Sequence, residues 1–290
     1  MHKFLRAIGI SCINKNELKE ILKKIEEYPT FHKTARDSEG NEFTEMCKEF
    51  GDSFGIALRG IYNEKDEFEM EYYYPYFCGS QISSREFVEV ERYAEKESYA
   101  GICDEVKIGV TLIFYLQNII DYLAMSENKN HCPAQEGIIL GALSTEGKIL
   151  LPINKTKHCS IHGKKQKNDR SSLIAAARDG DEDAIENLTL EDIDIYSMLS
   201  RRIAHEDILS IVDNYFMPYG IESDQYSVLG EIIDVHLVTN QLTGEKVYEL
   251  QLQCNEMMFS VCINQTDLLG EPQAGRRFKG NVWMQGKIKL

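Results

Sequence analysis

The sequence predicts an α+β protein, with an N-terminal mixed antiparallel β-sheet domain that also carries helices and a small β-barrel at the C-terminal end. Apolar residues recur at helical spacing in one N-terminal segment, whereas aromatic and β-branched residues alternate within residues 42–79. From residue 226 onward the apolar segments have the two-residue period of strands. These patterns place an α+β domain at 1–170, an acidic helical connector at 171–220 and a barrel domain at 221–290.

The N-terminal region begins with an amphipathic helix that starts at Asn16, its predicted N-cap, and stops before Pro29. Its apolar stripe comprises Leu18, Ile21, Leu22 and Ile25. Further along, GIALRGIY and FEMEYYYPYF flank the polar turn NEKDE and predict a β-hairpin. Residues 106–125 predict a buried strand or helix start that passes into a helix, and residues 137–153 predict two strands around the turn STEG.

The second strand of that hairpin is unusually aromatic, and two interpretations of it stay open. Stacked aromatic rings form platforms for planar ligands, whereas alternating aromatic residues in an ordinary strand lie half in the core and half on the surface. The aromatic residues concerned are Tyr72, Tyr73, Tyr74, Tyr76 and Phe77.

The C-terminal region predicts long strands joined by short turns, at residues 226–240, 246–254, 257–264 and 281–290. Long strands need glycine where they bend to close a small barrel, and such glycines are present. They are Gly230, Gly280 and Gly286. The sequence therefore predicts a closed or partly open barrel that resembles the oligonucleotide- and oligosaccharide-binding (OB) fold.

Composition restricts the class of protein. The 290 residues carry a formal net charge of -15 and are 43% hydrophobic, which is typical of a globular protein that repels polyanions. No apolar stretch reaches the ~20 residues that span a bilayer, and the start does not resemble a signal peptide. The eight cysteines are scattered singly, which favours free thiols. We therefore expect a cytoplasmic protein that does not bind membranes.

The basic C-terminal end is the strongest candidate for a binding surface. Arg276, Arg277 and Lys279 precede Trp283, the single tryptophan, and this combination can grip an anion and stack on a planar group. Residues 171–225 hold thirteen acidic residues against three arginines, so the alternative is that the basic end docks on them while Trp283 lies in the core. The expected partner is another protein or an anionic ligand, and the net charge disfavours nucleic acid.

The sequence contains no known catalytic motif, and no cofactor is predicted. Soft-metal ligands do occur in two groups, which would need to meet in space to form a site. They are His131 and Cys132 in one group, and His158, Cys159 and His162 in the other. The leading hypothesis is a non-enzymatic binding or interaction module that acts through the barrel. The alternative is an enzyme with a site between the domains, which uses His158, His162 or His205, with or without a metal.

Several segments make the chain similar to a known family. They are MHKFLRAIG, GVTLIFYLQN, EDIDIYSMLSRRI, FMPYGIESDQYSVLGEI, INQTDLLGEP and GRRFKGNVWMQG. The chain resembles, nearly end to end, bacterial proteins catalogued as a domain of unknown function in anaerobic Gram-positive bacteria of the clostridial group. That resemblance implies a cytoplasmic bacterial protein and assigns no catalytic residue.

Overall fold

A computed structural model describes most of the chain. The described residues are 2–36, 42–92, 98–105, 107–127, 134–153, 176, 181–183, 186, 209 and 212–290. The chain divides into two compact units, Met1–Leu150 with Asn214–Leu290, and Leu151–Asp213. All strands described below belong to the first unit, in which strands predominate over helices. The fold is therefore mostly β, with fewer helices than the predicted α+β class suggests, and it contains the predicted antiparallel sheet and barrel.

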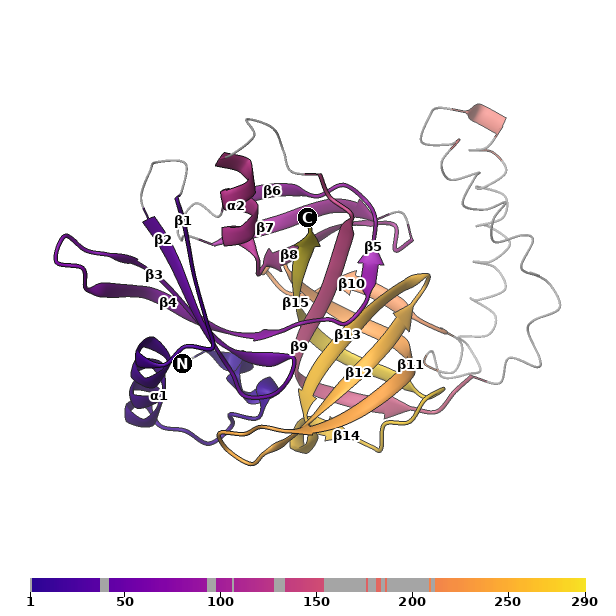
Figure 1. The fold of residues 1–290 in the computed structure, drawn as a ribbon. Coiled ribbons are helices and arrows are strands. Elements are labelled where there is room, and N and C mark those ends of the chain that lie inside the picture. Colours follow the sequence, from indigo (N-terminus) through magenta and orange to yellow (C-terminus); the bar gives the residue numbers. More distant parts are fainter. Residues whose placement is uncertain are drawn as a thin grey trace. The chain divides into compact units, whose positions relative to one another are not determined.

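The first sheet is antiparallel and has the order β1-β2-β3-β4 (Figure 1). Its strands are β1 (Phe31–Arg36), β2 (Glu42–Glu49), β3 (Phe54–Tyr62) and β4 (Phe68–Phe77). The hairpin of β3 and β4 confirms the prediction for this segment. Its turn is stabilised because the Asn63 side chain accepts hydrogen bonds from the backbone of Lys65 and Glu67, while Asp66 adopts a left-handed φ of 63°.

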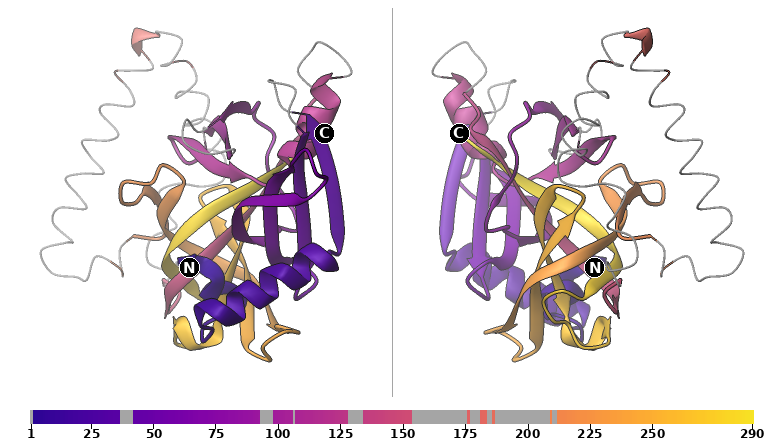
Figure 2. Two further views of the ribbon diagram at one scale, coloured as in Figure 1. Left: turned by 90° about the vertical axis from the view of Figure 1, so that its left-hand side faces the viewer. Right: turned by 90° about the vertical axis from the view of Figure 1, so that its right-hand side faces the viewer.

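Helix α1 (Lys15–Glu27) lies against this sheet (Figure 2). It begins two residues earlier than predicted: Asn14 is the N-cap, not Asn16, because Asn14 and Glu17 form a reciprocal capping box. The predicted apolar stripe is buried at Leu18, Leu22 and Ile25. A 3₁₀ segment, η1 (Lys3–Ile8), precedes it.

The second sheet closes on itself to form a five-stranded barrel. Its strands are β9 (Gly137–Leu150), β11 (Gln225–Thr239), β12 (Lys246–Cys254), β13 (Met257–Asn264) and β15 (Arg277–Lys289). The ring runs β11-β12-β13-β9-β15 and returns from β15 to β11. All its pairs are antiparallel except β13 with β9, which is parallel. A closed barrel of the predicted kind is therefore present.

Residues 137–150 form one continuous strand, so the predicted pair of strands around STEG is wrong. β9 pairs with β15 from its first residue to its last, which leaves no place for a turn. Gly147 is required for packing, because a Cβ there would lie 2.5 Å from the Phe278 ring. The Ser144 hydroxyl lies 2.8 Å from the carbonyl oxygens of both Glu146 and Asn281 and shares its one hydrogen between them.

The barrel joins residues from both sides of the boundary that the sequence placed near residue 220. β9 comes from the predicted N-terminal domain, yet it lies between β13 and β15. The barrel is therefore not made by the C-terminal strands alone. In addition, β10 (Tyr215–Pro218) lies within the predicted helical connector and pairs with β11 as a strand.

The glycines of the barrel serve close packing as well as bending. β15 shifts register between Gly280 and Val282, and a Cβ on Gly280 would lie 2.7 Å from the Glu146 carbonyl oxygen. A Cβ on Gly286 would lie 2.6 Å from the Phe114 ring. Side chains larger than hydrogen would therefore push the strands apart at both positions.

Shorter strands extend the second sheet beyond the barrel. They are β5 (Ile82–Ser84), β6 (Glu89–Arg92), β7 (Tyr99–Glu105), β8 (Val110–Leu116) and β14 (Leu268–Leu269), which follows the 3₁₀ segment η3 (Gln265–Asp267). β8 pairs in parallel with the end of β15 and is followed by helix α2 (Ile119–Glu127), which packs on β1 and β2. The strand-to-helix change agrees with the prediction for 106–125. Among the described helices, none has both the length and the apolar character needed to cross a membrane.

Candidate functional site

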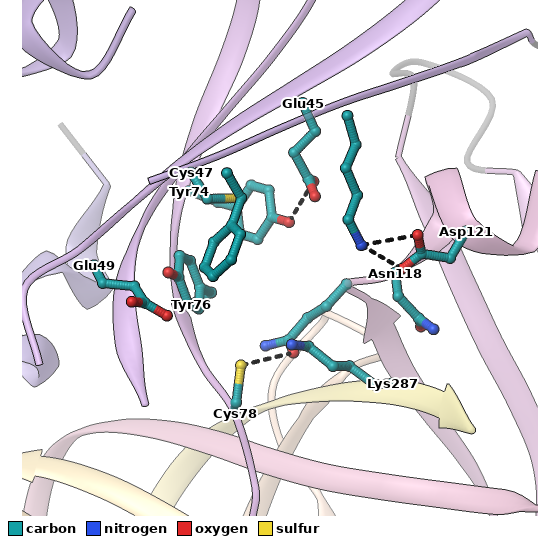
Figure 3. Close-up of a pocket in the computed structure, with 12 residues that line it drawn as sticks. Glu45, Cys47, Glu49, Tyr74, Tyr76, Cys78, Asn118, Asp121 and Lys287 are labelled. Carbon is teal, nitrogen blue, oxygen red and sulfur yellow. Dashed lines mark hydrogen bonds and ion pairs between the residues drawn. The ribbon is translucent and has the colours of Figure 1, made fainter. Parts of the chain in front are cut away.

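A cavity of about 240 Å³ opens between the first sheet, the start of α2 and the end of β15 (Figure 3). It is smaller than most drug-sized pockets, so it suits a small ligand. Its walls combine aromatic rings, thiols, amides and charged groups of both signs. Residues from three distant parts of the sequence therefore meet in one concave site.

The register of the first sheet explains the wall that it contributes. Directly paired residues of neighbouring strands project from the same face of a sheet. Three rows consequently share the face toward the cavity: Lys33, Glu45, Arg59 and Tyr72 in the first, Phe31, Cys47, Ala57 and Tyr74 in the second, and Glu49, Gly55 and Tyr76 in the third. The opposite face carries Met46, Ile56 and Leu58, which are buried.

The side chain of Arg59 is fully buried behind this wall. Its guanidinium donates hydrogen bonds to a carboxylate, two hydroxyls and two backbone carbonyls: Glu45 (2.5 Å), Tyr72 (3.1 Å), Tyr74 (3.1 Å), Leu116 (3.4 Å) and Gln117 (2.8 Å). The Tyr74 hydroxyl also donates to Glu45, at 2.9 Å. Because the two carbonyls immediately precede α2, Arg59 fixes the segment that forms the opposite wall.

Amide side chains hold that opposite wall in place. The Gln117 amide donates to the Gln285 carbonyl oxygen at 2.8 Å and to the backbone of Phe77 at 3.0 Å. Asn118 exchanges two hydrogen bonds with the backbone of Ile288, at 2.8 and 3.0 Å. These bonds flank Lys287 on both sides, so the strand that carries Lys287 is held rigidly beside β4.

Lys287 extends its ammonium group into the cavity (Figure 3). Burial by itself would lower the pKa of Lys287, but Cys78, followed by Cys47 and Glu45, raises the pKa above its usual value. The amine therefore stays protonated at neutral pH. In the described part of the chain, no carboxylate forms an ion pair with Lys287. The cavity thus contains a positive charge with unused hydrogen-bonding capacity.

The other perturbed groups in the cavity also retain their protons. Burial is the main cause of the raised pKa values of Cys47, Tyr74 and Tyr76. These side chains are neutral at neutral pH, and the hydroxyls of Tyr74 and Tyr76 remain hydrogen-bond donors. A general base needs a pKa near the working pH, which none of these three groups provides.

The four residues predicted as a binding surface lie on or beside the first part of β15. Arg277 and Trp283 are largely buried, at 5% and 6% exposure, whereas Arg276 and Lys279 are partly exposed. Lys279 and Trp283 are four residues apart on one strand, which corresponds to ~13 Å. The indole therefore does not lie beside Lys279, and binding by Arg276, Arg277, Lys279 and Trp283 stays a prediction.

The indole of Trp283 is covered by other side chains of the N-terminal region. Phe4 stacks on it with ring centroids 5.3 Å apart, and His2 and Tyr115 lie at 5.0 and 5.4 Å. Its Nε1 donates to Asp224 at 2.7 Å. Asp224 belongs to the acidic block 171–225, so one contact between the C-terminal end and that block is present.

The predicted metal ligands His131, Cys132, His158, Cys159 and His162 lie outside the described residues, as does His205. Within the described residues, no group of three or more potential ligands is placed to hold a metal ion. The metal site therefore stays a prediction, and zinc analysis of the purified protein tests it.

The sequence indicated some of the residues around the cavity, but it did not indicate that they form a cavity. Tyr72, Tyr74 and Tyr76 do share one face, as their alternation indicates. Arg59 interrupts the apolar run GIALRGIY, which is the signal of a buried charge that needs partners. Lys287 carried no such signal, because only the tertiary structure brings the end of β15 to this sheet.

Comparisons with known proteins assign the chain to a family but give no activity. A family model described as a domain of unknown function from an E. rectale gene description (DUF3881) matches residues 5–286. Searches of curated proteins and of solved structures gave no match. The family match spans the barrel strands except the last three residues of β15, and it includes every residue that lines the cavity apart from Lys287. The chain therefore belongs to the DUF3881 family.

Proposed function

We propose that this protein is a non-enzymatic binding module for a small ligand that carries an anionic group, and that the ligand occupies the cavity between the first sheet and β15. One observation carries this proposal: the Lys287 ammonium enters the cavity without a carboxylate partner in the described residues. A partly buried cation is costly unless an anion or a set of hydrogen bonds compensates it. A bound anion would supply that compensation.

The rigidity of the site supports binding. The Gln117–Gln285 pair and the Asn118–Ile288 bonds hold the backbone on both sides of Lys287. A site that is already formed does not spend binding free energy on ordering itself. The aromatic rings of Tyr74 and Tyr76 add apolar contact area beside the charge.

A fragment screen by differential scanning fluorimetry and ligand-observed NMR tests the proposal. We expect carboxylate-bearing fragments to bind the wild type and to lose at least about tenfold in affinity with Lys287→Met, since a hydrogen bond to a charged group contributes about 1.5–3 kcal/mol. Lys289→Met is the matched control, because Lys289 lies on the same strand and pairs with the exposed Glu136. Fragments that bind equally well to Lys287→Met, or a wild type that binds none, would contradict the proposal.

We further propose that the barrel is OB-like, with its strands in circularly permuted order. Strands β11, β12 and β13 form an antiparallel meander, β13 pairs in parallel with β9, and β15 closes the ring between β9 and β11. This arrangement supports an OB-like barrel when β9 is counted as its last strand. OB folds bind ligands on the outer face of their second and third strands. Here Glu249 and Gln251 on that face accept hydrogen bonds from Ser53 and Ser80. The protein's own N-terminal part thus occupies much of this face, which favours the cavity as the ligand site.

We propose the cytoplasm as the place of action. Cysteines that remain reduced are typical of reducing compartments, and every cysteine in the described residues is a free thiol. They are Cys12, Cys47, Cys78, Cys103, Cys254 and Cys262.

A further inference from the structure

The charged side chains that line the cavity fall into two groups. Three of them are neutralised within the protein: Lys33 binds Asp121 at 2.8 Å, and Glu45 binds Arg59. The remaining two, Glu49 and Lys287, form no ion pair in the described part of the chain. They have opposite signs, so the cavity presents one free negative and one free positive group.

The two free charges lie apart and do not neutralise each other. Glu49 is in the same row as Tyr76, with β3 between their strands, so their backbones are separated by two strand spacings, or ~10 Å. In Figure 3 the Glu49 carboxylate lies on one side of Tyr76 and Lys287 on the other. An aromatic surface therefore separates an acidic end of the cavity from a basic end.

We propose that the ligand is a small zwitterion, with an anionic group bound by Lys287, a cationic amine bound by Glu49, and an apolar spacer in contact with Tyr76. This inference rests on the proposed function and names its ligand class. A ligand of one sign would leave the other free group with nothing to bind, whereas a zwitterion satisfies both groups. The cavity volume of about 240 Å³ is below that of most drug-sized pockets, which suits a small molecule such as an ω-amino acid.

Isothermal titration calorimetry with a graded series of probes tests this inference. The zwitterions are β-alanine, γ-aminobutyrate, δ-aminovalerate and ε-aminocaproate, each compared with the carboxylate and the amine of the same chain length. We expect at least one zwitterion to bind at least about tenfold tighter than both single-charge analogues. The preferred length would report the separation of the two charged groups.

Two variants test which residue binds each charged group of the ligand. Glu49→Gln is expected to remove the advantage of the zwitterion over the carboxylate while the carboxylate binds as before. Lys287→Met is expected to remove the higher affinity of the zwitterion relative to the amine of the same chain length. Glu42→Gln, on the same strand and paired with the exposed Arg36, is the control for Glu49→Gln and should change neither affinity.

The outcomes separate this inference from the proposed function. If a carboxylate binds as tightly as its zwitterion and Glu49→Gln has no effect, the zwitterion inference is wrong but anion binding at Lys287 stands. If no zwitterion of the series binds although fragments from the screen do, the inference is again wrong. If neither fragments nor zwitterions bind, both fail.

Discussion

Replacement of Arg59 by methionine tests whether the buried guanidinium holds the first sheet to the segment before α2. Methionine fills similar space, but it removes the guanidinium hydrogen bonds to Glu45, two tyrosine hydroxyls and two backbone carbonyls. Glu45 would keep its hydrogen bond from the Tyr74 hydroxyl but lose its buried cation. The Glu45 side chain is only 11% exposed. Its carboxylate would therefore be left buried without a cation.

The expected loss of stability is large. Removal of one partner of a buried ion pair costs about 3–5 kcal/mol. The first compact unit comprises Met1–Leu150 and Asn214–Leu290, and in a protein of that size each kcal/mol changes Tm by about 2–4 °C. We therefore expect differential scanning calorimetry to show a fall in Tm of about 6–20 °C for Arg59→Met.

Two further variants make this prediction specific. Lys33→Met removes an ion pair whose side chains are 50% and 41% exposed, so its cost should stay below about 1 kcal/mol. The double variant Arg59→Met with Glu45→Leu should recover part of the lost stability, because no unpaired charge remains. A fall in Tm for Arg59→Met that is no larger than the fall for Lys33→Met would refute the reasoning.

Three other predictions follow from the described contacts. Trp283 is the single tryptophan and is 6% exposed, so its fluorescence should resist quenching by iodide; ready quenching would show an accessible indole. Burial raises the pKa of Asp224 in the folded protein, although the hydrogen bond from Trp283 opposes this rise. The free energy of unfolding should therefore fall as the pH rises from the pKa of Asp224 in the unfolded chain to its higher pKa in the folded protein. At neutral pH Asp224→Asn should then cost little in chemical denaturation, whereas Asp224→Ala should cost about 1–3 kcal/mol by leaving the indole N–H unsatisfied. Burial raises the pKa of Cys103 to about 12 and also raises the pKa of Cys47, so mass mapping after iodoacetamide treatment should show Cys12 modified before either; early modification of Cys47 would contradict this.

Local patterns predicted local structure well. Alternating apolar residues and a polar turn identified the β3–β4 hairpin, and the strict alternation of KVYELQLQC identified β12. β1 escaped notice because FHKTAR has no apolar alternation, and the strand is an exposed edge whose pairing with β2 defines it. Periodicity reports burial, so it does not detect a strand in which only Ala35 is buried.

Non-local structure could not be predicted from these patterns. Nothing in GIILGALSTEGKIL indicates that this strand completes a barrel with strands that follow it by about 75 residues or more, because pairing across such a distance leaves no periodic signal. The same limit explains the site. The sequence suggested Tyr74 and Tyr76 as a platform, but the partner wall depends on Gln117 and Lys287, which only the closure of β15 brings near them.

The position of β15 has a consequence for how the protein is made. β15 supplies the strand that closes the barrel, the glutamine that fixes the opposite wall and the lysine of the cavity. The ribosome synthesises it after every other strand of the barrel. A nascent chain that stalls before Arg277 therefore lacks both a closed barrel and a complete cavity, and the unpaired strand edges of β9 and β11 would be prone to aggregation. The cavity is consequently complete only in chains that are translated through β15.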